Sequence, residues 1–277
     1  MIAYRATLDV PDAVFATVVC WIRQHRKLVD RRPWQRAASC RDQVLLVLCC
    51  LKDAALVPAA ARDIAVSQAT GYRYFHEAVD VIAEHAPDLV DVLERAQLEG
   101  WSHIELDGTL IPTTRVSTRT ERGNDAWYSG KHKQHGGNLQ VLYDPHGFPV
   151  WIAPVEPGST HDITAARRHV FPGLNHAAAT WLPVLVDLGY DGADIGYHFP
   201  IRRPDLDKTT KARNRFLTVL RCICERGNAL LKAGWRYLRQ VTDHPDHPRR
   251  PRPNPPRSWL VRRPQWAPWG SNPRPAD

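Results

Sequence analysis

Apolar residues recur at three- and four-residue spacing through the first third of the chain. This spacing places apolar side chains along one side of a helix, and a proline inside such a segment ends the helix. The spacing occurs in residues 13–22, 44–56, 78–86 and 89–98, and Pro87 separates the last two segments. The pattern predicts helices through residues 11–98, within an all-helical amino-terminal region of residues 1–98.

A helix-turn-helix pattern lies inside this region. Residues 59–64 predict a short helix, residues 65–67 a tight connection and residues 68–83 a second helix, for which Ser67 is a suitable N-cap. This is the order of the DNA-binding helix-turn-helix motif, although two packed helices of an ordinary bundle give the same pattern. The second helix begins with polar residues that could contact bases, namely Gln68, Thr70, Tyr72 and Arg73.

After Trp101 the hydrophobic pattern changes to that of strands. Residues 103–107 alternate between polar and apolar, and two short apolar runs at residues 138–143 and 148–153 flank an Asp-Pro-His-Gly turn. These features predict one strand beside a hairpin. Further along, we expect a helix at residues 161–169, a buried strand at residues 182–187 and a long helix at residues 208–240. Strands flanked by helices predict an α/β or α+β domain with a mixed sheet over residues 99–240.

The carboxyl-terminal residues 241–277 differ in composition from the rest. They hold 10 of the 23 prolines, and seven arginines against three aspartates. Such a segment cannot sustain helix or sheet, so a disordered extension or the product of a frameshift is expected. It carries four of the eight net positive charges, which leaves the preceding region only mildly basic. A basic chain favours a polyanionic partner, but this charge alone is weak evidence.

Cysteine and hydropathy patterns indicate a cytoplasmic protein. The six cysteines form no CxxC pair, and two of them lie in the apolar run of residues 44–51. Free thiols in a reducing cytosol are therefore expected rather than a zinc site. Residues 1–10 lack the basic and apolar segments of a signal peptide, and no apolar run approaches the ~20 residues that span a membrane.

Two aspartates end predicted strands. Asp107 is followed by Gly108-Thr109, and Asp187 is followed by Leu188-Gly189-Tyr190. Carboxylates that end neighbouring strands can share one site, and hard oxygen ligands suit magnesium or manganese. A single aspartate at such a position is more often a turn or helix cap. The pair is therefore a candidate metal site.

The predicted long helix carries a polar stripe on one face. If this face meets the strand ends, Glu225 completes a three-carboxylate site, and Arg221 and Lys232 lie one to two turns away, where they could hold phosphates. The alternative is a solvated face on which Arg221 and Glu225 form an exposed pair. The stripe consists of Asn214, Thr218, Arg221, Glu225, Asn228 and Lys232.

The chain contains six motifs, namely Glu105–Thr109, Trp127–Lys133, Gly136–Asn138, Pro157–Asp162, Asp187–Tyr190 and the spacing Arg221-x3-Glu225-x6-Lys232. Together these motifs resemble bacterial insertion-sequence transposases of the DDE superfamily, in the insertion sequence five group, over residues 1 to about 240. By this resemblance, Asp107, Asp187 and Glu225 match the metal-binding triad, and Arg221 and Lys232 match the basic positions of the carboxyl-terminal signature. The signature usually opens with tyrosine where this chain has Thr218. The implied fold is an RNase H-like catalytic domain behind a helix-turn-helix region.

Asp162 is a rival for the second carboxylate of the triad. It lies with His161 in a recurrent motif of the family, but it follows a Gly-Ser-Thr loop and suits a helix cap, whereas Asp187 ends an apolar strand. We therefore expect His161 and Asp162 to support the metal ligands or to contact the substrate. A nearby basic loop, formed by Lys131, His132 and Lys133, could follow the DNA backbone or simply be solvated.

The resemblance implies two-metal phosphoryl transfer. The carboxylates would hold two Mg²⁺ or Mn²⁺ ions about 3.5 to 4 Å apart, one to activate water or a 3′-hydroxyl and one to stabilise the leaving oxygen. The expected partner is double-stranded DNA, both terminal inverted repeats and target DNA, bound by a homo-oligomer in a bacterial nucleoid. Two alternatives stay open: an inactive relict that only binds DNA, which the atypical tail suggests, and a host metal-dependent nuclease that cuts without joining.

Overall fold

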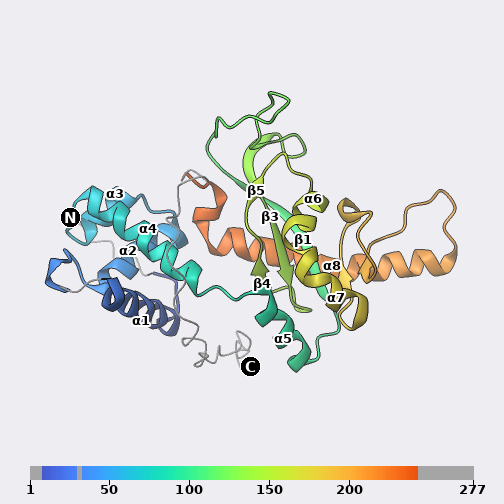
Figure 1. Cartoon of the computed structure of the whole chain (residues 1–277), viewed down its shortest axis with the longest axis horizontal. Coiled ribbons are helices and arrows are strands. Elements are labelled where there is room, and N and C mark those ends of the chain that lie inside the picture. The colour runs from blue at the N-terminus through green and yellow to red at the C-terminus, as the bar shows by residue number, and fades with distance from the viewer. Residues whose placement is uncertain (1–7, 30–32, 243–277) are drawn as a thin grey trace, which may run out of the picture. The chain divides into compact units, whose positions relative to one another are not determined.

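The computed structural model describes residues 8–29 and 33–242 (Figure 1). The segment predicted to be a disordered or frameshifted tail begins at residue 241, so all but its first two residues lie outside the described part. Among the helices of the described part, none has the length and apolar character needed to cross a membrane.

Residues 12–99 are largely helical, as their hydrophobic spacing predicts. The elements are α1 (Asp12–Val29), η1 (Pro33–Gln35), α2 (Cys40–Asp53), α3 (Val57–Asp63), α4 (Gln68–Glu84) and α5 (Leu89–Glu99). Apolar side chains of α1 to α4 form one core, in which Ile22, Val44 and Ala78 are fully buried. Pro87 lies between α4 and α5, where the sequence predicts a break.

Helices α3 and α4 pack closely against each other. Gly71 of α4 lies against α3, and a Cβ atom at this position would be 2.6 Å from the Cβ atom of Ala61. The predicted cap is confirmed, because the Ser67 hydroxyl accepts a hydrogen bond from the Thr70 amide at 3.2 Å. The order of short helix, tight connection and second helix is thus present. Because an ordinary helical bundle contains the same order of elements, the role of α3 and α4 as a DNA-binding motif stays a prediction.

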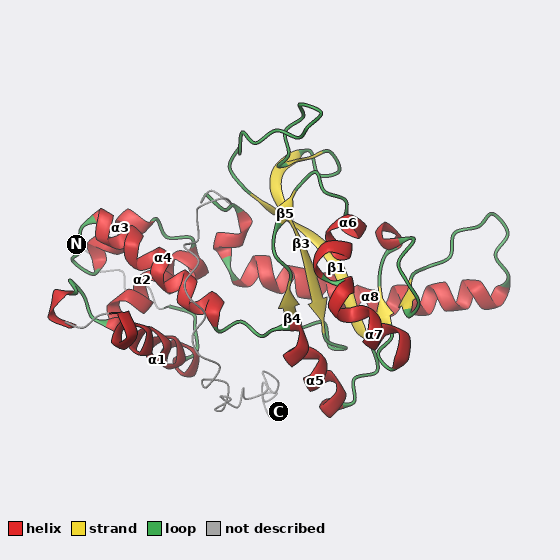
Figure 2. Ribbon diagram, in the orientation of Figure 1, coloured by secondary structure: helices red, strands yellow, loops and turns green. Residues whose placement is uncertain are grey.

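The strands form one mixed sheet with β1 at its centre (Figure 2). β1 pairs with β3 in antiparallel and with β6 in parallel orientation, and β6 pairs with β7 in parallel orientation. β2, β4 and β5 also pair with β3. This mixed α/β arrangement is compatible with the predicted RNase H-like fold. The strands are β1 (Ile104–Pro112), β2 (Tyr128–Ser129), β3 (Gln134–Tyr143), β4 (Pro149–Ile152), β5 (Glu156–Pro157), β6 (Val184–Leu185) and β7 (Tyr197–His198).

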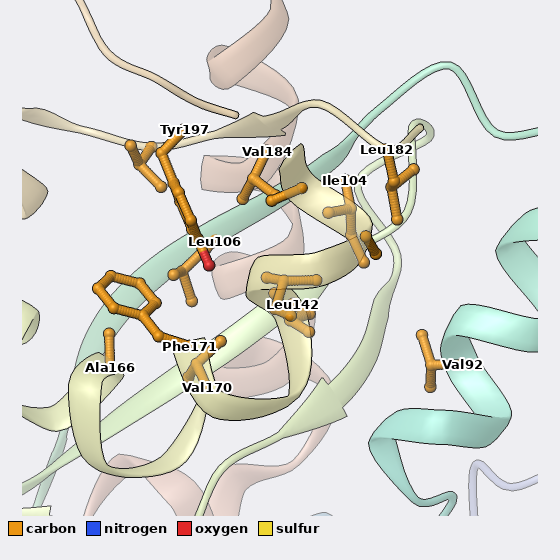
Figure 3. Packing of buried hydrophobic residues seen from close by; sticks show 14 of the residues in the cluster. Val92, Ile104, Leu106, Leu142, Ala166, Val170, Phe171, Leu182, Val184 and Tyr197 are labelled. Carbon is orange, nitrogen blue, oxygen red and sulfur yellow. The ribbon is translucent and has the colours of Figure 1, made fainter. Parts of the chain in front are cut away.

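Helices lie on both faces of this sheet. The larger core joins one face to α6 and α7 through buried residues such as Leu106, Leu142 and Phe171 (Figure 3). On the other face Tyr143 and Leu231 belong to a small cluster that packs α8 against the sheet. The remaining elements are α6 (Asp162–His169), α7 (Phe171–Thr180), η2 (Leu188–Tyr190), α8 (Lys208–Gly234) and η3 (Arg236–Arg239).

The boundaries of several elements differ from the sequence-based expectations. Asp107 lies in the middle of β1 rather than at its end, because antiparallel pairing with β3 carries the strand on to Pro112. β6 is shorter than the strand predicted at residues 182–187, since only two of its residues pair with neighbours. The long helix ends at Gly234 instead of residue 240, and a 3-10 turn follows. Helix α7 was not predicted.

Candidate active site

The parallel pairing of β1 and β6 brings the two predicted aspartates together. Ile104 pairs with Val184, and Glu105 pairs with Leu185. Asp107 lies two residues after Glu105, and Asp187 lies two residues after Leu185. Extending the same register by two residues therefore places the two aspartates opposite each other. There the two segments part, because β1 continues along β3 whereas the chain after β6 turns into η2. The site thus forms where two strands diverge, although only Asp187 lies beyond the end of its own strand.

The side-chain amide of Asn228, a residue of the long helix α8, forms a hydrogen bond with Asp107. Asn228 donates from Nδ2 to Asp107 Oδ2 at 2.8 Å, and the Tyr143 hydroxyl donates to Asn228 Oδ1 at 2.6 Å. Tyr143 therefore orients the amide so that its NH₂ group faces the carboxylate. Asn228 belongs to the polar stripe that the sequence reveals, but its contact with Asp107 was not expected.

The pKa of Asp107 is raised to about 6, chiefly by burial. The negative charges of Asp187 and Asp162 act in the same direction, whereas the positive charge of Arg221 and the hydrogen bond from Asn228 act against them. Like charges that converge in a partly buried site disfavour ionisation of each other. Additional positive charge at this position, such as a divalent cation, would favour the ionised carboxylate.

Asp162 lies close to this pair. It starts α6, as expected, but the N-cap residue is His161, which is exposed, so the predicted capping role of Asp162 is wrong. Its Oδ1 atom instead accepts a hydrogen bond from Asn138 Nδ2 at 2.8 Å. A Cβ atom at position 108 would be 2.5 Å from the same oxygen, so Gly108 leaves the room that the Asp162 carboxylate occupies beside β1.

The polar stripe on α8 divides into residues that face the sheet and residues that do not. Arg221, Asn228 and Lys232 are partly buried, and burial lowers the pKa of Lys232 while the charge of Asp107 raises it. Glu225 is exposed, although it lies on the same helical face one turn before Asn228. The described residues contain no group of three or more His, Cys, Asp or Glu side chains that could hold a metal ion as they stand.

Two further stripe residues make structural hydrogen bonds near the start of α8. Asn214 binds both backbone groups of Ile201, with its Oδ1 atom 2.9 Å from the amide nitrogen and its Nδ2 atom 2.8 Å from the carbonyl oxygen. Thr218 donates from its hydroxyl to the carbonyl oxygen of Asn214 at 2.9 Å. The amino-terminal part of the stripe is therefore structural.

The predicted basic loop lies beside the carboxylates. Lys131 Nζ is 3.4 Å from Asp162 Oδ2, and the lysine side chain is mostly exposed. The pKa of His132 is lowered by burial and by the charges of Lys131 and Lys232, against the opposite effect of Asp162. Lys133 is exposed and has a positive φ of 54°. Cations of the loop and of α8 thus surround the carboxylates.

The candidate base-reading residues at the start of α4 are not equivalent. Gln68, Tyr72 and Arg73 are exposed. Thr70 is buried, and its hydroxyl oxygen is 3.0 Å from Ser67 Oγ and 2.9 Å from Arg73 Nη2. Thr70 therefore orients Arg73, whereas the other three side chains are accessible to a ligand.

A mixed sheet with two neighbouring aspartates near its central strand, and with cationic side chains close to them, is compatible with a nuclease domain that acts on phosphate esters. Comparison with models of known protein families identifies the family to which the chain belongs. The model of the DDE superfamily endonucleases matches residues 106–252, more than half of the 277 residues, and the chain belongs to this family.

Membership of this family confirms the superfamily and the transposase-type nuclease class that the sequence motifs predict. DDE endonuclease domains act on DNA and generally use divalent metal ions. No curated protein and no solved structure matches the chain.

Proposed function

We propose that this protein is a DNA transposase of the insertion sequence five group, which cleaves and joins DNA at the ends of its own element. The observation that carries the proposal is the register of β1 and β6, in which Glu105 pairs with Leu185, so that Asp107 and Asp187 each lie two residues beyond a paired position and the charge of Asp187 acts on Asp107. Asp107 in turn contacts α8, the helix that carries Glu225, Arg221 and Lys232. The proposal assigns Asp107, Asp187 and Glu225 to the metal-binding triad that the sequence motifs predict.

The side chains of the site fit a divalent cation by their chemistry. The donors are carboxylate oxygens, which suit Mg²⁺ or Mn²⁺, and the charges of Asp187 and Asp162 raise the pKa of Asp107 in a way that a cation would relieve. Asp107 and Asp187 would hold metal, and Glu225 would complete the ligand set by turning its exposed side chain toward Asp107. Two bound ions would activate water or a 3′-hydroxyl and stabilise the leaving oxygen.

The protein's own cations would position the DNA. Arg221 and Lys232 lie on the same face of α8 as Asn228, which touches Asp107, so they can bind the phosphate that reacts. Lys131 and Lys133 are exposed on the loop beside Asp162, where they can contact the flanking backbone. Gln68, Tyr72 and Arg73 at the start of α4 would read bases in the terminal inverted repeats.

The test is cleavage and joining of labelled DNA that carries the inverted repeats flanking the gene. Asp187→Ala and Glu225→Ala should retain DNA binding and lose both reactions in Mg²⁺ and in Mn²⁺. Asp191→Ala, which changes an exposed aspartate four residues after Asp187, should behave like the parent. Activity in both triad variants would overturn the assignment of the ligands. A parent that cleaves without joining would instead be a host nuclease.

A second candidate function is that of a relict transposase that binds DNA without reacting. The exposure of Glu225, and the lack of any preformed three-ligand group among the described residues, favour this candidate. The same assay separates the two functions. A folded parent that binds end DNA but does not cut it in Mn²⁺ would be the relict.

A further inference from the structure

A buried hydrogen-bond network lies next to the candidate active site. Its centre is Gln140 of β3, whose side chain is fully buried. Gln140 Oε1 accepts a hydrogen bond from the Tyr190 hydroxyl at 2.6 Å, and Gln140 Nε2 donates to Asn138 Oδ1 at 2.9 Å. Nε2 is also 3.4 Å from Asp162 Oδ1. The network therefore joins β3, α6 and the turn after β6.

Every donor of the two amides in this network is used. Gln140 Nε2 has the two partners given above, and Asn138 Nδ2 donates to Asp162 Oδ1 at 2.8 Å and to the Thr160 carbonyl oxygen at 2.9 Å. A buried polar network in which all groups are paired fixes one arrangement, because any other leaves a group without a partner. The orientation of Gln140 is therefore fixed, and so is the oxygen that it offers to Tyr190.

Tyr190 links this network to Asp187. It ends the 3-10 turn η2, whose N-cap is Asp187, and its amide bonds to the Asp187 carbonyl oxygen at 3.2 Å. The Asp187 carboxylate accepts a hydrogen bond from the Gly189 amide at 2.7 Å within the same turn. The Tyr190 ring is fully buried in the large core. The ring and its hydroxyl thus anchor the short turn that carries Asp187.

Asp162 and Asp187 approach the same small space. A Cβ atom on Gly189 would be 2.8 Å from Asp187 Oδ1 and 3.6 Å from Asp162 Oδ2. Gly108 leaves room for both the Asp162 carboxylate and Gln140, because a Cβ atom at position 108 would be 2.5 Å from Asp162 Oδ1 and 2.9 Å from Gln140 Nε2. The network thus holds one carboxylate through its amides and the other through Tyr190.

We propose that Gln140 and Tyr190 are positioning residues, whose hydrogen bond sets where Asp187 and Asp162 stand relative to Asp107 and thereby the affinity of the site for a divalent cation. This inference rests on the proposed metal-dependent function. Neither residue binds the cation. Partners that orient metal ligands typically change metal affinity about 10- to 100-fold when they are removed.

Tyr190→Phe tests the inference, because it removes only the hydroxyl group. The matched control is Tyr197→Phe, since Tyr197 is a buried residue of the same core whose hydroxyl also donates to an amide, Asn175 Oδ1, at 2.8 Å. The measurement is the Mn²⁺ binding isotherm of the full chain without DNA. Tyr190→Phe should raise the Kd for Mn²⁺ about 10-fold, whereas Tyr197→Phe should stay within about twofold of the parent. An equal Kd in the two variants would overturn the inference.

A second variant tests whether Gln140 and Tyr190 act through the same hydrogen bond. Gln140→Met keeps the side-chain length but removes both polar atoms, so it should weaken Mn²⁺ binding at least as much as Tyr190→Phe. The double variant should bind Mn²⁺ no more weakly than Gln140→Met alone, because the two changes break the same hydrogen bond. Additive losses would mean that the two side chains act separately and that their hydrogen bond positions nothing.

The outcomes also separate this inference from the proposed function. If the parent fails to cut DNA but Tyr190→Phe still weakens Mn²⁺ binding, the transposase function is wrong and the positioning role stands. If the parent cuts and joins but Tyr190→Phe binds Mn²⁺ like the parent, only the positioning role is wrong. If Asp187→Ala leaves Mn²⁺ binding unchanged, the carboxylates hold no metal and both are wrong.

Discussion

Two carboxylates, one in each region of the molecule, have opposite environments. Glu77 of α4 receives two hydrogen bonds from Arg36, at 2.8 and 2.9 Å, and one from Gln43 at 2.9 Å. Burial alone would raise its pKa, but hydrogen bonds from His25, Arg36 and Gln43 outweigh burial and lower the pKa to about 2. Asp107 receives one amide hydrogen bond and faces two further aspartates, and its pKa is raised to about 6.

This contrast separates a structural carboxylate from one that we propose as a metal ligand. The partners of Glu77 come from α1, from the segment before α2 and from α2 itself, so its charge ties the helices to α4. At Asp107, burial and the negative charges of Asp187 and Asp162 outweigh the positive charge of Arg221 and the hydrogen bond from Asn228, so an added cation would favour the ionised carboxylate. The fold therefore gives Glu77 several hydrogen-bond partners from neighbouring segments, whereas it leaves the Asp107 carboxylate able to bind an added cation.

The largest effect on stability is expected from removing the structural carboxylate. Glu77→Ala removes the mostly buried carboxylate that Arg36 and His25 contact, and breaking such a pair costs about 3 kcal/mol or more of the free energy of unfolding. Urea denaturation at neutral pH measures this loss. Glu84→Ala, an exposed change in the same helix, should cost less than about 0.5 kcal/mol. Equal losses in the two variants would mean that the Glu77 cluster contributes no specific stability.

In metal-free protein, replacing Asp107 is expected to increase the free energy of unfolding, whereas replacing Glu77 lowers it. A raised pKa means that Asp107 favours the folded state fully below its unfolded pKa of about 3.9, and that this contribution is lost as pH rises through about 6. Asp107→Asn should therefore stabilise the protein above pH 6, by about 3 kcal/mol, with the gain shrinking toward pH 4. Urea denaturation in chelator at both pH values measures this difference.

Added Mn²⁺ should reverse this result, because the ion stabilises the ionised parent and not the variant. Glu77 supplies an internal comparison. Its lowered pKa means that its contribution is present above the unfolded value and is lost as pH falls toward about 2. A gain for Asp107→Asn that is independent of pH would contradict the assigned charge environment.

The hydrophobic pattern predicts the fold better at its helices than at its strands. The start of α4 is predicted correctly, because Ser67 is a local signal read from one residue. Helix α7 is missed because Pro172 and Gly173 read as helix breakers, although proline is favoured in the first turn of a helix. The length of β1 beyond Asp107 depends on pairing with β3, which no local pattern contains.

The site is predictable as a set of residue types but not as a geometry. The pattern identifies Asp107 and Asp187 because both are preceded by apolar strand residues. Their facing positions follow from a parallel register, and the closeness of Asp162 follows from the room that Gly108 leaves beside the strand. Such long-range contacts carry no signal in a single sequence. The assignment of Glu225 stays a prediction.

The smallest effect is expected in the amino-terminal region, where DNA binding should not depend on metal. Arg73 is exposed at the start of α4 and its guanidinium is held by the Thr70 hydroxyl at 2.9 Å. Arg73→Ala should weaken binding of end DNA by about 1 kcal/mol with or without Mn²⁺, and it should lower the salt slope by about 1 if the side chain contacts a phosphate. Arg62→Ala, an exposed change on α3, should leave affinity and slope unchanged.

Fluorescence anisotropy over a range of salt concentrations measures both the affinity and the salt slope. Equal affinity of the parent and Arg73→Ala would remove α4 from the DNA interface. A loss seen only with Mn²⁺ would place Arg73 in the metal-dependent step instead, and the division between a structural and a functional region would no longer hold.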